Sequence, residues 1–186
     1  EATQPKFSPS QNTLVDIGNV VTSGDMTISL SFYATDWDGT GGSDTLLSTD
    51  DTSRIFLNAA GQIGMRWSEA NYTWSDLSFD LHEDTTIVLT RTDGIWSLVL
   101  NGVTSAQTKD DAGIDWTWTT IGSRSGTGQL FDGFIWNVNI NDQAAYSGRG
   151  ATPWADTIGS NDGTPAGSFY NLPRQLLLAS SSASNT

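Results

Sequence analysis

The chain has 186 residues, of which 8 are Lys or Arg and 21 are Asp or Glu, so its formal net charge at pH 7 is −13. This length suits one domain with a real hydrophobic core, and the negative charge disfavours nucleic acid and anionic membrane surfaces as partners. There is no Cys, which excludes disulfides, thiol nucleophiles and zinc–thiolate sites. No apolar run is long enough for insertion into a membrane.

The amino terminus, EATQPKF, lacks the basic start and apolar middle of a signal peptide. Because the sequence begins at Glu1, we expect a mature chain or a fragment of a larger parent protein. Eighteen of the acidic residues are Asp and 19 residues are Gly, which favours turns over helices.

Apolar and polar residues alternate along much of the chain, which is typical of half-buried β-strands. The clearest stretch is 26–33, where one side is apolar and the other carries hydroxyl groups. The residues that this alternation assigns to inward faces are Met26, Ile28, Leu30 and Phe32, then Ile63, Met65 and Trp67, then Ile87 and Leu89, then Trp96, Leu98 and Leu100, and finally Phe134, Trp136, Val138 and Ile140.

Two dipeptides, Asp93-Gly94 and Asn101-Gly102, are typical of two-residue hairpin turns because their residues tolerate positive φ. They predict a three-stranded meander over residues 84–106. Many short strands without crossover helices predict an all-β fold, a two-sheet antiparallel jelly-roll β-sandwich.

The composition changes after residue 142, where turn residues replace the alternating pattern. We expect residues 1–142 to form the sandwich and residues 143–178 to wrap over it, anchored by Trp154 and Phe169. Residues 179–186 are expected to be a flexible polar tail.

The order of these elements resembles the concanavalin A-like lectin/glucanase superfamily, and within it the laminin G-like jelly rolls. The resemblance covers residues 6–142 and is carried by KFSPSQNTLVDIG, DMTISLSFYA, TTIVLTRTDGIWSLVLNG, TTIGSR and FDGFIWNVNIND. It implies the concanavalin A-like fold, which hosts lectins, glycan-binding modules, glycosidases and adhesion domains, so the fold does not select one function. The segment WADTIGSNDGTPAGSF is similar to sequences in surface and tail-fibre proteins of bacteria and phages.

Catalysis has little support in the sequence. The resemblance implies that an enzyme of this fold would carry two glutamates on one strand, spaced ExDxE or ExDxxE, whereas the three Glu of this chain are scattered. His82 is the single histidine, and no GxSxG motif accompanies it, so we interpret it as a solvated loop residue.

The acidic loops leave a metal site open. Without Cys or a His pair, only a hard oxygen site for Ca²⁺ remains. One interpretation places a calcium ion among Asp36, Asp44 and Asp111. The other is that these residues form turns by bonding to their own backbone.

Eight tryptophans are more than a core of this size ordinarily needs. If Ile121 points inward, parity places Trp116 and Trp118 on the outer face, where indoles stack on sugar rings and Arg124 would bond to hydroxyls. A bulge between these tryptophans and Gly122 would reverse that orientation.

Further sugar-binding candidates lie in two loops. Trp37 and Asp38 occupy the DWDG loop tip, where no local core surrounds an indole. The other segment, RWSEANYTWSD, holds the second set of candidates: Arg66, Tyr72, Trp74 and Asp76. The alternative for Tyr72 and Trp74 is a loop that folds back over the end of the sandwich.

These patterns predict a non-catalytic, lectin-like adhesion or receptor-binding domain that binds a cell-surface or extracellular polysaccharide, displayed outside a cell or on a virion such as a phage tail. One alternative is a structural domain of a virion or surface assembly, a homo-oligomer whose contacts cover Trp116 and Trp118. The other is a polysaccharide-active hydrolase or lyase that uses Tyr72, His82 or Asp residues.

Overall fold

The computed structural model describes residues 4–36, 43–49, 53–111, 113–124 and 129–172. This part of the chain is almost entirely β-structure, with one short 3₁₀ turn at Pro9–Gln11 and no helix long and apolar enough to cross a membrane. The strands are β1 (Gln4–Lys6), β2 (Leu14–Thr22), β3 (Met26–Ala34), β4 (Ser43–Ser48), β5 (Arg54–Asn58), β6 (Ile63–Trp67), β7 (Ala70–Thr73), β8 (Asp84–Thr92), β9 (Ile95–Leu100), β10 (Val103–Asp110), β11 (Trp116–Ile121), β12 (Gly133–Ile140), β13 (Ala144–Tyr146), β14 (Thr164–Ala166) and β15 (Tyr170–Leu172).

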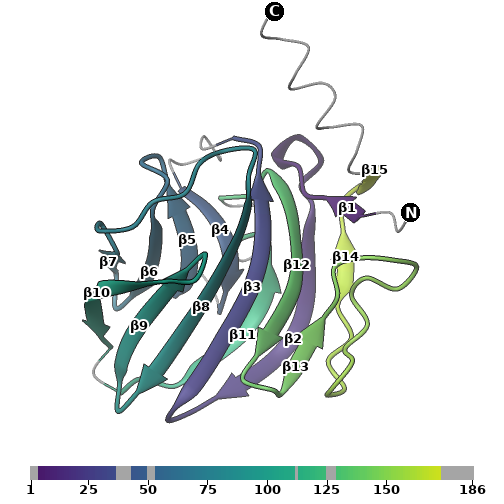
Figure 1. The fold of residues 1–186 in the computed structure, drawn as a ribbon. Coiled ribbons are helices and arrows are strands. Elements are labelled where there is room, and N and C mark those ends of the chain that lie inside the picture. The colour runs from purple at the N-terminus through teal and green to yellow at the C-terminus, as the bar shows by residue number, and fades with distance from the viewer. Residues whose placement is uncertain (1–3, 37–42, 50–52, 112, 125–128, 173–186) are drawn as a thin grey trace, which may run out of the picture.

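Two antiparallel sheets lie face to face and enclose the core between them (Figure 1). One sheet has the strand order β10-β9-β8-β3-β12-β13, and the other has the order β14-β2-β11-β4-β5-β6-β7. A third, two-stranded ladder joins β1 to β15. This arrangement confirms the predicted all-β, two-sheet jelly-roll sandwich.

The predicted meander is present as β8, β9 and β10. Asp93 and Gly94 turn the chain between β8 and β9 with φ angles of 50° and 80°, and Asn101 and Gly102 turn it between β9 and β10 with angles of 49° and 83°. Positive φ at both central residues is the geometry that matches the twist of a two-residue hairpin.

The interior contains most of the aromatic side chains. Each of the seven tryptophans that the structure describes is at most 5% exposed: Trp67, Trp74, Trp96, Trp116, Trp118, Trp136 and Trp154. The inward faces predicted for β3, β6, β8 and β9 all belong to the main core. Six of these seven indoles therefore belong to the main core, and none of the seven lies exposed on the surface.

The face predicted for β12 is wrong at its amino-terminal half. Val138 and Ile140 lie in the main core, but Phe134 and Trp136 belong to a separate cluster with Tyr33 on the other side of the sheet. The pairing of β12 with β3 shifts after Trp136, where Asn137 has a φ angle of 50°. This bulge inserts one residue and reverses the side-chain parity along the strand.

Residues after 142 extend both sheets. β13 pairs with β12, β14 pairs with β2, and β15 pairs with β1 at the opposite end of the described chain. The intervening loop is packed down by aromatic rings, because Trp154 and Phe169 lie 5.6 and 5.2 Å from the ring of Phe7 in edge-to-face contacts. Figure 1 shows this segment along the side of the sandwich formed by β2 and β13. The expected tail, 179–186, lies outside the described residues.

A buried carboxylate joins the two sheets. Asp111 accepts hydrogen bonds from the Nε1 atoms of Trp96 and Trp116, at 2.8 and 2.9 Å, and from the backbone N–H of Gly113. Its partner ion is Arg91, whose Nη2 lies 2.9 Å from Oδ1 and whose Nε lies 2.8 Å from Oδ2. Because β9 and β11 belong to different sheets, this one side chain holds the two layers in register.

The protonation of Asp111 follows from these contacts. Burial alone would raise the pKa of the carboxyl, but the hydrogen bonds from Arg91, Trp116, Trp96 and Gly113 outweigh burial and hold the pKa below its ordinary value. The carboxylate therefore stays ionised at the centre of the fold.

We predict that Asp111→Ala lowers the free energy of unfolding by about 3–5 kcal/mol, because it leaves a buried guanidinium and two indole N–H groups without their acceptor. For a domain of this size the melting temperature would fall by about 10 °C. Urea denaturation and calorimetry measure both. The matched control is Asp80→Ala at an exposed position, which should change stability by no more than about 0.5 kcal/mol.

The same variant should show a defined pH dependence. A carboxyl whose pKa is lowered by folding contributes stability above its unfolded pKa of about 4, and this contribution is lost as the pH falls through the folded value. The stability gap between wild type and Asp111→Ala should be constant from neutral pH down to about pH 5 and shrink below about pH 4. A gap that widens in acid would contradict the assigned role.

Candidate functional site

The predicted outward orientation of Trp116 and Trp118 is wrong. Their side chains are 1% and 0% exposed, and their rings stack on each other with centroids 5.0 Å apart. The indole N–H of Trp118 donates to the hydroxyl of Thr22, as that of Trp116 does to Asp111. Neither ring is available to a sugar or to a neighbouring subunit.

The reason is a bulge in β11. Its register against β2 shifts between Trp118 and Thr120, so Ile121 and the two tryptophans all face the core although their spacing in sequence is odd. Thr119 sits at the shift and donates its hydroxyl hydrogen to the carbonyl oxygen of Thr49. The irregular pairing absorbs one residue and reverses the parity from which the outward orientation was inferred.

The candidates of the second loop serve mainly to fold it. Trp74 is fully buried and its Nε1 donates to the carbonyl of Gln107. Tyr72 stacks on the core residue Trp67 with ring centroids 3.8 Å apart. The alternative reading, that this segment folds over the end of the sandwich, is therefore correct for Tyr72 and Trp74.

Asp76 ties the same loop to β10. Its carboxylate accepts hydrogen bonds from the hydroxyl of Ser105 and the backbone N–H of Ala106, and these bonds, the hydroxyl first, hold its pKa below the ordinary value. Both bonds are internal to the fold, so Asp76 acts as a loop clamp. The other predicted pair, Trp37 and Asp38, lies outside the described residues.

The acidic residues named for calcium are not gathered into one site. The carboxylate oxygens of Asp111 accept hydrogen bonds from two indole N–H groups and from the guanidinium of Arg91. Asp111 therefore has no free oxygen for a calcium ion, and this part of the prediction is wrong. Asp44 is fully buried on β4, while Asp36 precedes residues that the structure does not describe. Among described residues no three carboxylate or histidine side chains lie close enough to hold a metal ion.

Two predicted residues lie near a third arginine of the seven-stranded sheet. Arg66 on β6 and Arg124 after β11 both act electrostatically on Arg54 of β5, a residue that the sequence patterns did not single out. Arg66 bonds to Asn71 at 3.5 Å. These three arginines form a local group of positive charge in a chain whose net charge is −13.

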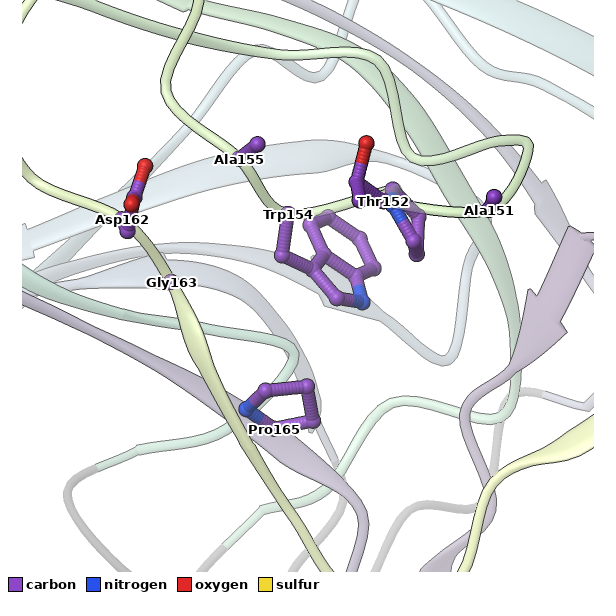
Figure 2. Close-up of a pocket in the computed structure, with 8 residues that line it drawn as sticks. Ala151, Thr152, Trp154, Ala155, Asp162, Gly163 and Pro165 are labelled. Carbon is purple, nitrogen blue, oxygen red and sulfur yellow. The ribbon is translucent and has the colours of Figure 1, made fainter.

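A hollow lies elsewhere, beneath the loop that follows β13. Its volume is about 310 Å³, at the small end of the range for ligand sites. Figure 2 shows the indole of Trp154 between two parts of the chain: the loop that carries Ala151 and Thr152, and the segment from Asp162 to Pro165. The lining residues are Ala151, Thr152, Pro153, Trp154, Ala155, Asp162, Gly163 and Pro165.

The walls of this hollow are held by the carboxylate of Asp156. It accepts backbone N–H bonds from both sides of the loop, from Ala145, Ile158, Gly159 and Asn161. Burial would raise the pKa of Asp156, but these four backbone donors lower it below the ordinary value. The loop is thus closed on itself without help from a ligand.

A glycine lets the opposite wall approach the indole. The N–H of Gly163 donates to the carbonyl of Trp154 at 2.7 Å. A Cβ at this position would lie 2.6 Å from the Cγ1 of Val15 and 3.1 Å from the Cβ of Trp154. A side chain there would push the walls apart, so the hollow depends on this glycine.

The hollow combines an apolar lining with two polar groups. The prolines, the alanines and the indole supply carbon surface, and Asp162 supplies a carboxylate whose Oδ1 accepts the N–H of Asp156. The indole N–H of Trp154 is buried and has no hydrogen-bond partner within the described part of the chain. Sequence patterns identified Trp154 as an anchor only, and none of them marked the cavity that it lines.

Comparisons with solved structures agree on the fold. The chain matches the LG1–3 region of the laminin alpha2 chain with a TM-score of 0.61 and 18% identity, over 92% of this chain and 30% of that one. It matches a candidate carbohydrate-binding protein from Bacteroides ovatus with a TM-score of 0.67 and 16% identity, over 92% of this chain and 60% of the other. A heptameric SAP-like pentraxin from Limulus polyphemus matches with a TM-score of 0.58 and 11% identity, over 90% and 88% of the two chains.

These likenesses confirm the jelly-roll fold that the sequence resemblance implied. The chain spans less than two thirds of the length of the first two proteins. No protein-family model matches the sequence, and neither does any curated protein.

The burial of the indoles has a spectroscopic consequence. We predict that a Trp37→Phe variant keeps seven tryptophans that iodide cannot quench, because each is at most 5% exposed. Steady-state fluorescence with increasing iodide measures this, and the same titration in 8 M urea gives the fully accessible reference. Quenching of the folded variant close to that reference would show that the indoles face water.

Proposed function

We propose that this chain is a non-catalytic carbohydrate-binding domain and that the hollow around Trp154 takes a single neutral sugar residue. The observation that carries this proposal is the buried, unpartnered indole N–H of Trp154, a residue that lines an apolar cavity together with Asp162. A buried donor without an acceptor costs free energy that a ligand oxygen can recover.

The chemistry of the hollow suits a saccharide. A sugar ring has C–H surfaces, which pack on proline, alanine and indole carbons, and hydroxyl groups, which both accept and donate hydrogen bonds. Trp154 offers a donor and Asp162 an acceptor. The likeness in fold to a candidate carbohydrate-binding protein supports the same ligand class.

The chemistry of this hollow favours binding over hydrolysis. Glycosidases of the usual kind place two carboxyl groups about 5–9 Å apart, one of them protonated. Asp162 is the one carboxylate among the residues that line this hollow. The adjacent Asp156 has a lowered pKa and is engaged by backbone N–H groups, so it is a poor proton donor.

The expected affinity is modest. One indole, a small apolar surface and two polar groups correspond to dissociation constants in the micromolar to millimolar range. Several copies on one particle or surface would raise the avidity. Display outside a cell or on a virion, and a bound calcium ion, remain predictions from the sequence. Assembly through Trp116 and Trp118 is withdrawn, since both rings lie in the core.

We predict that Ala151→Tyr abolishes binding to neutral oligosaccharides, because the added ring fills the hollow. Trp154→Phe keeps the ring and removes one hydrogen bond, so it should weaken binding by roughly two- to tenfold, the effect of about 0.5–1.5 kcal/mol. An array of neutral hexose and pentose oligosaccharides identifies the probe, and calorimetric titration with that oligosaccharide measures the constants.

The matched control is Ala59→Tyr, the same substitution at an exposed alanine in the turn after β5. It should bind as the wild type does. Absence of any neutral ligand on the array, or binding that survives Ala151→Tyr unchanged, would disprove the proposal.

A further inference from the structure

Arg54 is a buried cation that has no ion-pair partner among the residues that the structure describes. It precedes Ile55 and Leu57, which face the core, so the alternation along β5 places it with Phe56 on the outer face of the seven-stranded sheet. Its side chain is only 2% exposed. Neither its Nε nor its Nη1 has a hydrogen-bond partner within the described part of the chain.

The positive charges of neighbouring arginines further disfavour the charged form of Arg54. Arg66 lies directly opposite Arg54 in the pairing of β5 with β6, and the Nε of Arg66 is also buried without a partner. Burial first, and then the charges of Arg124 and Arg66, lower the pKa of Arg54 to about 10. Arg54 is still a cation at neutral pH, held next to two others in a protein whose net charge is −13.

The second buried arginine of the chain shows what a satisfied guanidinium looks like here. Arg91 is also 2% exposed, yet it bonds to the carbonyls of Gly24 and Ile114 and forms an ion pair with Asp111. The burial of Arg91 thus comes with an ion pair and two backbone carbonyl acceptors. Arg54 has no such ion pair among the described residues, as expected for a group whose acceptor is a ligand.

The surroundings hold the guanidinium in place. Its Cζ lies 5.4 Å from the ring centroid of Phe56, and that ring covers Gly64, where a Cβ would come within 2.4 Å of the ring. Ser48, opposite Arg54 on β4, donates its hydroxyl hydrogen to the carbonyl of Ser123 and so fixes the segment that leads to Arg124. The donors are therefore positioned in advance of any ligand, which lowers the entropic cost of binding.

We propose that Arg54 and Arg66 bind the carboxylate of an acidic sugar residue, a hexuronate, on the outer face of the seven-stranded sheet. A guanidinium fork matches a carboxylate by two parallel hydrogen bonds. A sugar that carries one charge suits this local group of cations, whereas a densely charged polyanion would be repelled by the acidic remainder of the molecule. The saccharide part of this inference rests on the proposed carbohydrate-binding function; the anion part does not.

The site is separate from the Trp154 hollow. In the strand order of the seven-stranded sheet, β2, β11 and β4 lie between β14, which borders the hollow, and β5, which carries Arg54. A variant that blocks one site should leave the other intact.

The test is a calorimetric titration of the whole chain at constant ionic strength with a galacturonic acid trimer, the neutral galactose trimer and sodium acetate. The uronate should bind to wild type and to Ala151→Tyr alike, and at least tenfold more weakly to Arg66→Gln and Arg54→Met. The control is Arg149→Gln, which removes an exposed arginine that lies over Trp136. It should bind the uronate as the wild type does.

A second measurement separates a binding role from a structural one. Without ligand, Arg54→Met should melt at a higher temperature than the wild type, because it removes a buried charge that has no partner and keeps a similar side-chain volume. A lower melting temperature would show that Arg54 has an internal counter-ion and would overturn the proposal.

The remaining outcomes also decide. Equal affinity for acetate and the uronate would show an anion site that does not recognise a sugar, and would contradict the proposal. A uronate affinity that is unchanged in Arg54→Met and Arg66→Gln would also contradict it. Loss of uronate binding in Ala151→Tyr alone would place the acidic sugar in the Trp154 hollow instead. If the neutral-sugar proposal is wrong, the array of neutral oligosaccharides will show no binding, whatever the result with the uronate.

Discussion

The carboxylate of Asp111 is the contact on which the rest of the sandwich depends. It accepts indole N–H groups from β9 of one sheet and β11 of the other, and its charge is balanced by Arg91 of β8. A core this rich in tryptophan has to satisfy each indole N–H as well as pack each ring. One ionised acid does this for two rings and neutralises a buried arginine at the same time.

This constraint accounts for the burial of the seven described tryptophans, each of which is at most 5% exposed. The described indoles are used between and beside the sheets, with Trp116 stacked on Trp118 and set edge-on against Trp96 and Trp67. Ligand recognition is then left to places where the fold does not complete its own hydrogen bonding. Two such groups in the described part of the chain carry the proposals, the indole N–H of Trp154 beside β14 and the guanidinium of Arg54 on β5.

Much of the architecture could be predicted from alternation and turn chemistry. The Asp-Gly and Asn-Gly dipeptides located the meander, and the period of two located the core faces of β3, β6, β8 and β9. The errors on β11 and β12 share one cause, since each strand contains a bulge that shifts side chains by one position. A bulge is set by pairing with a neighbouring strand, and neither Thr119 nor Asn137 marks it in the sequence. For the same reason the sequence did not single out Arg54. Its lack of an ion-pair partner depends on the residues that pairing places beside it on β4 and β6.

The central claim is that binding uses the indole of Trp154, whose buried N–H has no hydrogen-bond partner among the described residues, rather than the stacked indoles of the core. Each indole N–H gives its own signal in a ¹H–¹⁵N correlation spectrum, and substitution of single tryptophans by phenylalanine assigns the signals. On titration with the best neutral oligosaccharide from the array, the Trp154 signal should move the most, while those of Trp96, Trp116 and Trp118 should stay in place. A titration that moves the Trp116 and Trp118 signals and leaves Trp154 unchanged would contradict the account.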